Sequence, residues 1–311
     1  NQVREDRSGP DRGPVAGVTV ATLGQWIEGA RPRTLPAAVS PVLVGAGAAW
    51  FAGGRIRWLV AAGCLLVSLA LQVGVNFAND YSDGIRGTDA DRVGPMRLVG
   101  SGAAPPRQVK LAAFGCFAVA AGAGLAVVAG SGQWWLLLVG LGCILAAWYY
   151  TGGQHPYGYA GWGEVMVFLC FGLVAVLGTT QVLLGRVTWD ALYGAVAVGA
   201  ISCAVLVANN LRDLVSDRAC GKRTLATRLG DRGSRWFYLA LALTAAAAVG
   251  LAALSTPWAL LGLLGVVLLA GPARTVLAGA QGPALIGVLR NTGLAGLVLA
   301  AGLTLGWALG S

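Results

Sequence analysis

Two short polar motifs, each placed where a long apolar run ends, carry the residues best suited to chemistry. Their acidic and amide side chains are Asn76, Asn79, Asp80 and Asp83 in the first motif, and Asn209, Asn210, Asp213 and Asp217 in the second. In a helix, Asn76, Asp80 and Asp83 share one face. The same geometry groups Asn209, Asp213 and Asp217. Because carboxylates gathered in this way repel each other unless a cation lies between them, the pattern predicts Mg²⁺ holding a diphosphate.

Basic residues lie close to both motifs. Arg97 follows the first motif, and Lys222 and Arg228 follow the second. Such cations can hold the phosphate oxygens that a metal leaves free, and they stabilise the charge that develops on a leaving diphosphate. For one such motif alone, ordinary ion pairs at the protein surface would be about as good an explanation as a binding site. Two similar motifs at equivalent helix ends favour a binding site.

The composition is that of a membrane protein. Hydrophobic residues make up 56% of the 311 residues and charged residues only 11%, with a mean hydropathy of +0.69, whereas soluble proteins carry about 25% charged residues. The apolar runs are continuous rather than alternating, which favours helices over barrel strands. We therefore predict an all-α, multi-span membrane protein with nine transmembrane helices. Their ranges are 36–53, 58–78, 108–129, 133–151, 163–184, 190–211, 235–253, 257–277 and 284–307.

The positive charges agree with this count. With the N-terminus inside, all Lys and Arg residues except Arg55, Arg57 and Arg186 lie on the inner side or at its flanks, as the positive-inside rule requires. The predicted location is the cell membrane, with the N-terminus and the loops of both motifs facing the cytoplasm. Because the net charge of +9 follows this topology, it does not indicate a nucleic-acid partner.

The other sequence features narrow the possibilities. Residues 1–21 are typical of a mobile polar tail, and residues 22–311 form the predicted transmembrane domain, which opens with a short surface helix at 22–30. The cysteines lack CxxC spacing and His155 is the only histidine, which argues against a zinc site, a disulfide framework or haem. Glu164, near a predicted span start, is expected at the membrane interface.

The segment Asn79-Asp80-Tyr81-Ser82-Asp83-Gly84, together with Asp213 and Asp217, resembles the UbiA-type superfamily of intramembrane prenyltransferases. Within it, segments 79–89, 94–102, 209–213 and 221–230 resemble the members, of actinobacterial type, that act on 1,4-dihydroxy-2-naphthoate in menaquinone synthesis. The resemblance covers roughly residues 22–311. It implies a nine-helix bundle around a central cavity with both motifs at its cytoplasmic mouth. It also implies Mg²⁺-dependent transfer of the chain of polyprenyl diphosphate to 1,4-dihydroxy-2-naphthoate, releasing CO2 and diphosphate and forming demethylmenaquinone.

The resemblance also implies roles for individual residues. The expected metal ligands are Asn76, Asp80, Asp83, Asn209, Asp213 and Asp217. The expected catalytic residues are Asp80, Asp83, Asp213, Asp217 and Lys222, and the expected substrate-binding residues are Asn79, Arg97, Asn210, Arg228, Tyr149 and Arg33. Arg33 and Tyr149 would serve the naphthoate or the prenyl cation. When the first motif is read as Asn-x-x-x-Asp-x-x-x-Asp, its third position is Gly84, so Asp83 must supply that carboxylate.

Two alternatives stay open at this point. The many spans and the basic inner loops would also suit a secondary transporter for an anionic solute, although transporters place ionisable coupling residues near the middle of spans. A prenyltransferase of the same superfamily that uses another acceptor, such as 4-hydroxybenzoate or haem, is the second alternative. Prenyl chain length and oligomeric state are not predicted.

Overall fold

The computed structural model describes residues 21–53, 55–87 and 96–311. Throughout these residues the chain is helical, with no strand, which confirms the predicted all-α class. The predicted polar tail, except for Ala21, lies outside the described residues.

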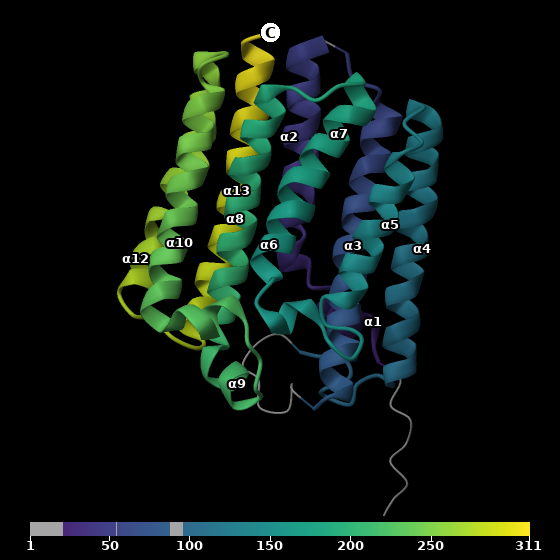
Figure 1. Cartoon of the computed structure of the whole chain (residues 1–311), viewed down its shortest axis with the longest axis vertical. Coiled ribbons are helices and arrows are strands. Elements are labelled where there is room, and N and C mark those ends of the chain that lie inside the picture. The colour runs from purple at the N-terminus through teal and green to yellow at the C-terminus, as the bar shows by residue number, and fades with distance from the viewer. Residues whose placement is uncertain (1–20, 54, 88–95) are drawn as a thin grey trace, which may run out of the picture.

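Long helices lie side by side along the longest axis of the molecule (Figure 1). The spans that consist of a single helix are α2 (Pro36–Gly53), α3 (Trp58–Ile85), α4 (Pro106–Ser131), α5 (Leu136–Tyr149), α8 (Trp189–Arg212), α10 (Leu225–Ala252), which is kinked, and α13 (Ala284–Leu309). Two composite spans are α6 (Gly163–Val167), η3 (Phe168–Val174) and α7 (Ala175–Leu184), and η4 (Pro257–Gly262), α11 (Leu263–Leu268) and α12 (Ala270–Leu277). The short connecting elements are α1 (Leu23–Ala30), η1 (Pro32–Thr34), η2 (Tyr157–Ala160) and α9 (Leu214–Ala219).

Every predicted span coincides with one of these helices or composites. Within the described ranges, 8 of them are long and apolar enough to cross a membrane, and the ninth, α5, is a shorter apolar helix. Its 14 residues extend about 21 Å, less than the roughly 30 Å of a bilayer core. The chain is therefore a multi-pass membrane protein close to the predicted nine-span form.

The helices pack closely because small residues lie where they touch. A Cβ on Gly45 of α2 would lie 2.5 Å from the Val176 carbonyl oxygen of α7, and one on Gly172 of η3 would lie 2.8 Å from Gly199 Cα of α8. Lipid gives helices no hydrophobic reason to associate, so such close backbone contact is a main source of attraction between spans. Substituting either glycine would push two helices apart.

Two helix boundaries differ from the sequence-based ones. The range 58–78 continues as α3 to Ile85, and 235–253 starts earlier, at Leu225 of α10, with a kink at Gly230 (φ 73°). The sequence-based ranges follow the apolar residues, which are the part of a helix that a membrane requires. Both helices continue beyond these residues for further, more polar turns. As a result the first motif stays helical, and its side chains have fixed directions.

One span contains a wide turn that the sequence pattern did not predict. Residues 168–174 form the π-helix η3 inside the span 163–184. Such turns are rare and concentrate at functional sites. Cys170, Phe171 and Val174 of η3 line the central cavity.

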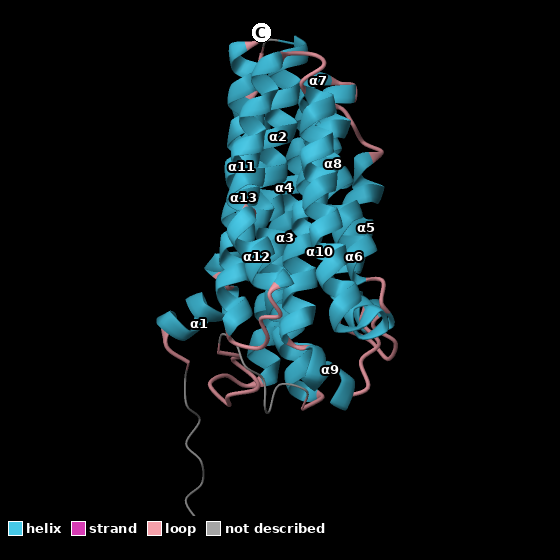
Figure 2. Ribbon diagram, turned by 90° about the vertical axis from the view of Figure 1, so that its left-hand side faces the viewer, coloured by secondary structure: helices cyan, strands magenta, loops and turns pink. Residues whose placement is uncertain are grey.

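The polar motifs and the amphipathic helix lie at the same end of the bundle. Helices α1 and α9 are found there, and the C-terminus lies at the opposite end (Figures 1 and 2). Helix α1 starts with a capping box between Thr22 and Gln25, packs Trp26 against Phe77 of α3, and leaves Leu23 76% exposed. An apolar residue so exposed beside the bundle suits a helix lying in the membrane surface.

Candidate active site

A cavity of about 1090 Å³ occupies the centre of the bundle. Its polar end is formed by residues of both motifs, namely Asn76, Asn79, Asp83, Asn209, Asn210, Asp213 and Asp217, together with Arg97, Lys222 and Arg33. Its apolar part continues between α3, α5 and η3, past Leu71, Cys143 and Phe171. The cavity thus joins a charged end to a long apolar channel.

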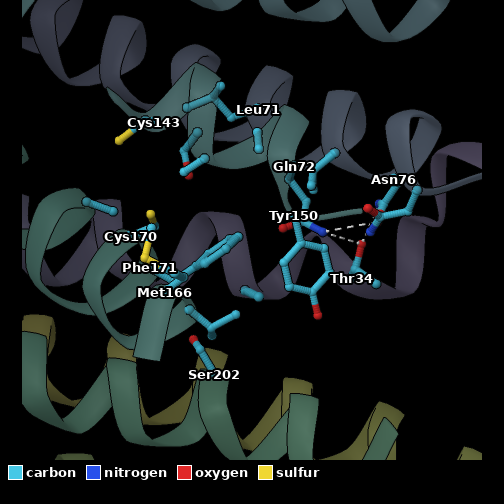
Figure 3. A pocket seen from close by; sticks show the side chains of 18 of the residues that line it. Thr34, Leu71, Gln72, Asn76, Cys143, Tyr150, Met166, Cys170, Phe171 and Ser202 are labelled. Atoms are coloured by element: carbon cyan, nitrogen blue, oxygen red, sulfur yellow. Dashed lines mark hydrogen bonds between the residues drawn. The ribbon is translucent and has the colours of Figure 1, made fainter. Parts of the chain in front are cut away.

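Figure 3 shows the middle of the cavity, where the polar and apolar parts meet. Gln72 Nε2 and Asn76 Nδ2 each donate to Thr34 Oγ1 at 3.0 Å, and Asn76 Nδ2 also donates to the Ala30 carbonyl oxygen at 2.9 Å. These bonds fasten the segment between α1 and α2 onto α3. Tyr150 lies beside them, and Phe171 lies farther along (Figure 3).

The first motif directs Asp83 into the charged end. Its carboxylate is 4% exposed overall and accepts a hydrogen bond from the Tyr159 hydroxyl. Arg97 Nη2 lies 3.8 Å from Asp83 Oδ2, and Lys222 Nζ lies 3.7 Å from Oδ1. Asn79, one turn earlier on α3, also lines the cavity and accepts a hydrogen bond from Thr151 Oγ1 at 2.8 Å.

The second motif is built at the junction of α8 and α9. Asp213 is the residue that caps the C-terminus of α8, and Asp217 lies in the first turn of α9, where its N–H donates to the Asp213 carbonyl oxygen at 2.8 Å. Arg212 binds Asp213 through Nε and Nη2, both at 2.7 Å, and Nη2 also donates to Asn209 Oδ1 at 2.9 Å. Two carboxylates and an amide oxygen therefore face one side of the cavity.

Lys222 connects the two motifs. Besides its contact with Asp83, its Nζ lies 3.8 Å from Asp217 Oδ1 and 4.5 Å from the centre of the Tyr159 ring. The Lys222 N–H donates to the Asp217 carbonyl oxygen, and the Arg223 N–H donates to the Tyr159 carbonyl oxygen, both at 2.9 Å. The loop after α9 and the loop of η2 therefore hold a cation between carboxylates that are far apart in the sequence.

Asp80 has a different set of contacts from the predicted one. It is fully buried, outside the cavity lining, and its two oxygens accept hydrogen bonds from the Leu98 N–H (2.8 Å) and the Val99 N–H (3.0 Å). On a helix, Asp80 is turned by about 100° from Asn79, so the two cannot face the same way. The cavity face of α3 is that of Asn76, Asn79 and Asp83, whereas Asp80 fixes the segment that carries Arg97.

Two further predicted site residues do not reach the cavity. Tyr149 is 51% exposed on the outside of α5, and its neighbour Tyr150 lines the cavity instead. Arg228 turns toward the η2 loop, where Nη2 donates to the Ala160 carbonyl oxygen at 2.7 Å. That bond holds the loop in which Tyr159 lies.

Several residues at this site were missed by the sequence reasoning. Glu164, expected at the membrane interface, is 4% exposed at the start of α6 and accepts a hydrogen bond from Asn210 Nδ2 at 2.9 Å. A carboxylate at the start of an apolar span is itself a signal of function. Arg212 is visible only as the neighbour of Asp213. Tyr159 lies in a Gly-rich loop with no distinguishing spacing.

A half-buried tyrosine lies beside the site. Burial raises the pKa of the Tyr157 hydroxyl well above its ordinary value, and this hydroxyl donates to the Ala146 carbonyl oxygen at 2.7 Å. Tyr157 lines the cavity, so this hydrogen bond anchors the η2 loop against α5.

The donor set at the charged end fits Mg²⁺ shared with a phosphate ligand. Carboxylate and amide oxygens are the hard donors that this ion prefers, and it commonly takes only a few from the protein and the rest from substrate phosphates and water. In the described part of the chain no three acidic, His or Cys side chains converge on one point. Instead, Arg97, Lys222 and Arg212 lie against the carboxylates.

Comparison with protein families gives a direct match. Residues 38–284 match the model of the UbiA prenyltransferase family. A 1,4-dihydroxy-2-naphthoate octaprenyltransferase from Mycobacterium tuberculosis is 52% identical over 281 residues, covering 90% of this chain and 96% of that protein. The Escherichia coli protein of the same name is 37% identical, covering 81% of this chain and 84% of its own.

Solved structures share the fold at low sequence identity. A UbiA homolog from Aeropyrum pernix in its apo form is similar with a TM-score of 0.69 and 15% identity, covering 87% of this chain and 97% of its own. A UbiA homolog from Archaeoglobus fulgidus bound to GPP and Mg²⁺ has a TM-score of 0.63 and 14% identity, covering 91% of this chain and 99% of its own.

Proposed function

This chain belongs to the UbiA prenyltransferase family, and we propose that it transfers the chain of polyprenyl diphosphate to 1,4-dihydroxy-2-naphthoate. The reaction releases CO2 and diphosphate and forms demethylmenaquinol, the reduced form of demethylmenaquinone, in a step of menaquinone biosynthesis. The observation that carries this proposal is the position of Lys222, which joins Asp83 and Asp217 at the charged end of a cavity whose remainder is apolar. A charged head and a long apolar tail are the two parts of a prenyl diphosphate.

The charged end would hold the diphosphate. Asp83, Asp213 and Asp217, with the amide oxygens of Asn79 and Asn209, are the residues that would hold Mg²⁺, and the ion would neutralise charge on the leaving diphosphate. Lys222 and Arg97 would bind the phosphate oxygens, and fixed cations of this kind stabilise a leaving group as its C–O bond breaks. Asp80 serves this site through the Leu98–Val99 backbone rather than from the cavity.

The apolar part would guide the reaction after the C–O bond lengthens. Water is excluded by side chains such as Leu71 and Phe171, which protects a prenyl carbocation from hydrolysis. The rings of Tyr150 and Phe171 line the same space and can stabilise positive charge. The naphthoate ring forms the new C–C bond at its carboxyl-bearing carbon, and loss of CO2 then returns the bonding electrons to the ring.

The basic residues support the proposed orientation in the membrane. The helix ends that carry both motifs and the Lys222 loop lie at one end, and Arg186, an exception to the charge pattern, lies in the loop between α7 and α8. The positive-inside rule therefore supports our proposal that the charged end faces the cytoplasm at the cell membrane. There the acceptor and the metal arrive from water, while the prenyl chain arrives from lipid.

A direct assay tests this function. Purified full-length protein is incubated with Mg²⁺, a radiolabelled prenyl diphosphate and 1,4-dihydroxy-2-naphthoate, and the lipid-soluble product is extracted and identified by mass. Excess unlabelled 4-hydroxybenzoate tests the other acceptor class. Competition by 4-hydroxybenzoate with formation of its own prenylated product would overturn the naphthoate assignment, and the absence of any prenylated product would overturn the enzyme assignment.

A further inference from the structure

Arg212 lines the charged end of the cavity, and the proposed reaction gives it no role. It is the last residue of α8, its side chain is 4% exposed, and it lines the cavity beside Asp213. A buried guanidinium needs strong hydrogen-bond acceptors. In the absence of a ligand, Asp213 supplies them and so fixes the position of the Arg212 side chain.

Those contacts use the atoms that a divalent cation would need. The guanidinium takes both carboxylate oxygens of Asp213 at 2.7 Å and Asn209 Oδ1 at 2.9 Å. Asp213 and Asn209 are two of the second motif's oxygen donors in the cavity lining. A metal ion that binds these oxygens must therefore share them with Arg212 or displace it.

Displacement alone would be unfavourable. It would leave a buried, uncompensated guanidinium beside a divalent cation, and truncating or unpairing one member of such a buried pair is strongly destabilising. If a diphosphate arrives with the metal, the guanidinium gains phosphate oxygens, which its planar fork can bind through two hydrogen bonds as it binds a carboxylate. The free-energy cost of leaving the guanidinium unpaired is then removed.

We propose that Arg212 is an exchangeable counter-ion that competes with the metal for Asp213 and Asn209 and moves to the diphosphate when both ligands bind. Metal and diphosphate then bind synergistically, each weakly without the other. This inference rests on the proposed function, because it takes the charged end as the diphosphate site. It differs from a purely positioning role, in which Arg212 would orient Asp213 for the metal and its loss would weaken metal binding.

The position of Arg212 suits such an exchange better than that of Lys222. Lys222 lies 3.7 and 3.8 Å from two different carboxylates, so it can stay between them while a ligand binds. Arg212 instead makes short, two-pronged contacts with one carboxylate, which must be broken before that carboxylate can serve a metal fully. Its side chain already lines the cavity, so the transfer needs rotation of the side chain alone.

The test measures metal binding without turnover. Full-length protein in detergent is titrated with Mn²⁺, which shares the oxygen preference of Mg²⁺, and free Mn²⁺ is followed by electron paramagnetic resonance. The titration is repeated with saturating farnesyl S-thiolodiphosphate, an unreactive analogue. The variants are Arg212→Gln, Arg212→Lys and, as a matched loss of one arginine charge in the α7–α8 loop outside the cavity lining, Arg186→Gln.

The competition predicts changes in opposite directions. Without the analogue, Arg212→Gln binds Mn²⁺ on the order of tenfold more tightly than wild type, since a competing charged hydrogen-bonded partner is gone. With Mn²⁺ saturating, the same variant binds the analogue on the order of tenfold more weakly. Arg186→Gln matches wild type in both titrations. Arg212→Lys keeps the charge but not the planar guanidinium, so its affinities lie between those of wild type and Arg212→Gln.

The contrary results are equally distinct. Weaker or unchanged Mn²⁺ binding by Arg212→Gln without the analogue overturns the exchange. If Arg212→Gln does not yield folded protein, the same comparison is made with Arg212→Lys alone, where Mn²⁺ binding no tighter than wild type overturns it. Failure of the proposed function is recognised separately, because wild-type protein would then form no prenylated naphthoate whatever the Mn²⁺ titrations give.

Discussion

Lys222 Nζ lies 3.7 Å from Asp83 Oδ1, although Asp83 is on α3 and Lys222 is in the loop between α9 and α10. The contact is possible because α3 carries Asp83 beyond the apolar span and the loop after α9 returns to it. The Tyr159 hydroxyl completes the arrangement by donating to the same carboxylate. This shared contact region is the basis of the predictions below.

The first prediction concerns Lys222. Lys222→Gln removes the cation shared by Asp83 and Asp217, and we expect kcat/KM for the prenyl diphosphate to fall about 10- to 100-fold, the range for losing charged hydrogen bonds. Steady-state rates of naphthoate prenylation measure this. Lys110→Gln is the control, since Lys110 lies over the rings of Tyr81 and Trp148, outside the cavity lining. Equal loss in both variants would refute a specific role for Lys222.

The second prediction separates Asp83 from Asp80. Asp83→Asn removes a charge from the cavity, so the Mg²⁺ concentration for half-maximal rate should rise at least several-fold. Asp80→Asn replaces an acceptor of two backbone N–H groups by an amide with one donor end, so we expect a loss of stability of about 1–3 kcal/mol and little change in the Mg²⁺ requirement. Mg²⁺ titrations of the rate and thermal unfolding distinguish them. A raised Mg²⁺ requirement in Asp80→Asn would restore the sequence-based assignment of this residue to the metal.

The third prediction concerns Glu164. Glu164→Gln keeps an oxygen that can accept the Asn210 hydrogen bond, so activity and thermal stability should stay close to wild type. Glu164→Leu leaves the buried Asn210 amide without this partner and should reduce stability by about 1–3 kcal/mol. Thermal unfolding in detergent, followed by circular dichroism, measures both. Identical unfolding of the Gln and Leu variants would show that the hydrogen bond contributes nothing.

The fourth prediction concerns the apolar part of the cavity. Phe171→Trp reduces the space between η3 and α5, so the ratio of kcat/KM for long against short prenyl diphosphates should decrease. Phe171→Leu should leave that ratio the same or raise it. Leu251→Trp, at an exposed position of α10, is the matched control for added bulk. A ratio unchanged by Phe171→Trp would mean that the chain does not pass this residue.

The membrane spans could be predicted from the sequence because the bilayer imposes a length of apolar chain that is visible residue by residue. The helical turns beyond the membrane could not be predicted, since the polar residues Asn79 to Asp83 are still helical. The direction of Asp80 depends on which side of α3 faces the cavity, and Leu98 and Val99 decide it from a separate segment. Tyr159 and Glu164 enter the site from elements without a motif, so only the folded chain identifies them.

The central claim is that the two motifs form one diphosphate site, and a double-mutant cycle tests it most directly. Binding of farnesyl S-thiolodiphosphate in saturating Mn²⁺ is measured for wild type, Asp83→Asn, Asp217→Asn and the double variant. If both carboxylates hold one ligand together, the double variant should lose little more affinity than either single variant, because residues that act as a unit are strongly non-additive. Losses that simply add, or a single variant that binds as tightly as wild type, would contradict a shared site.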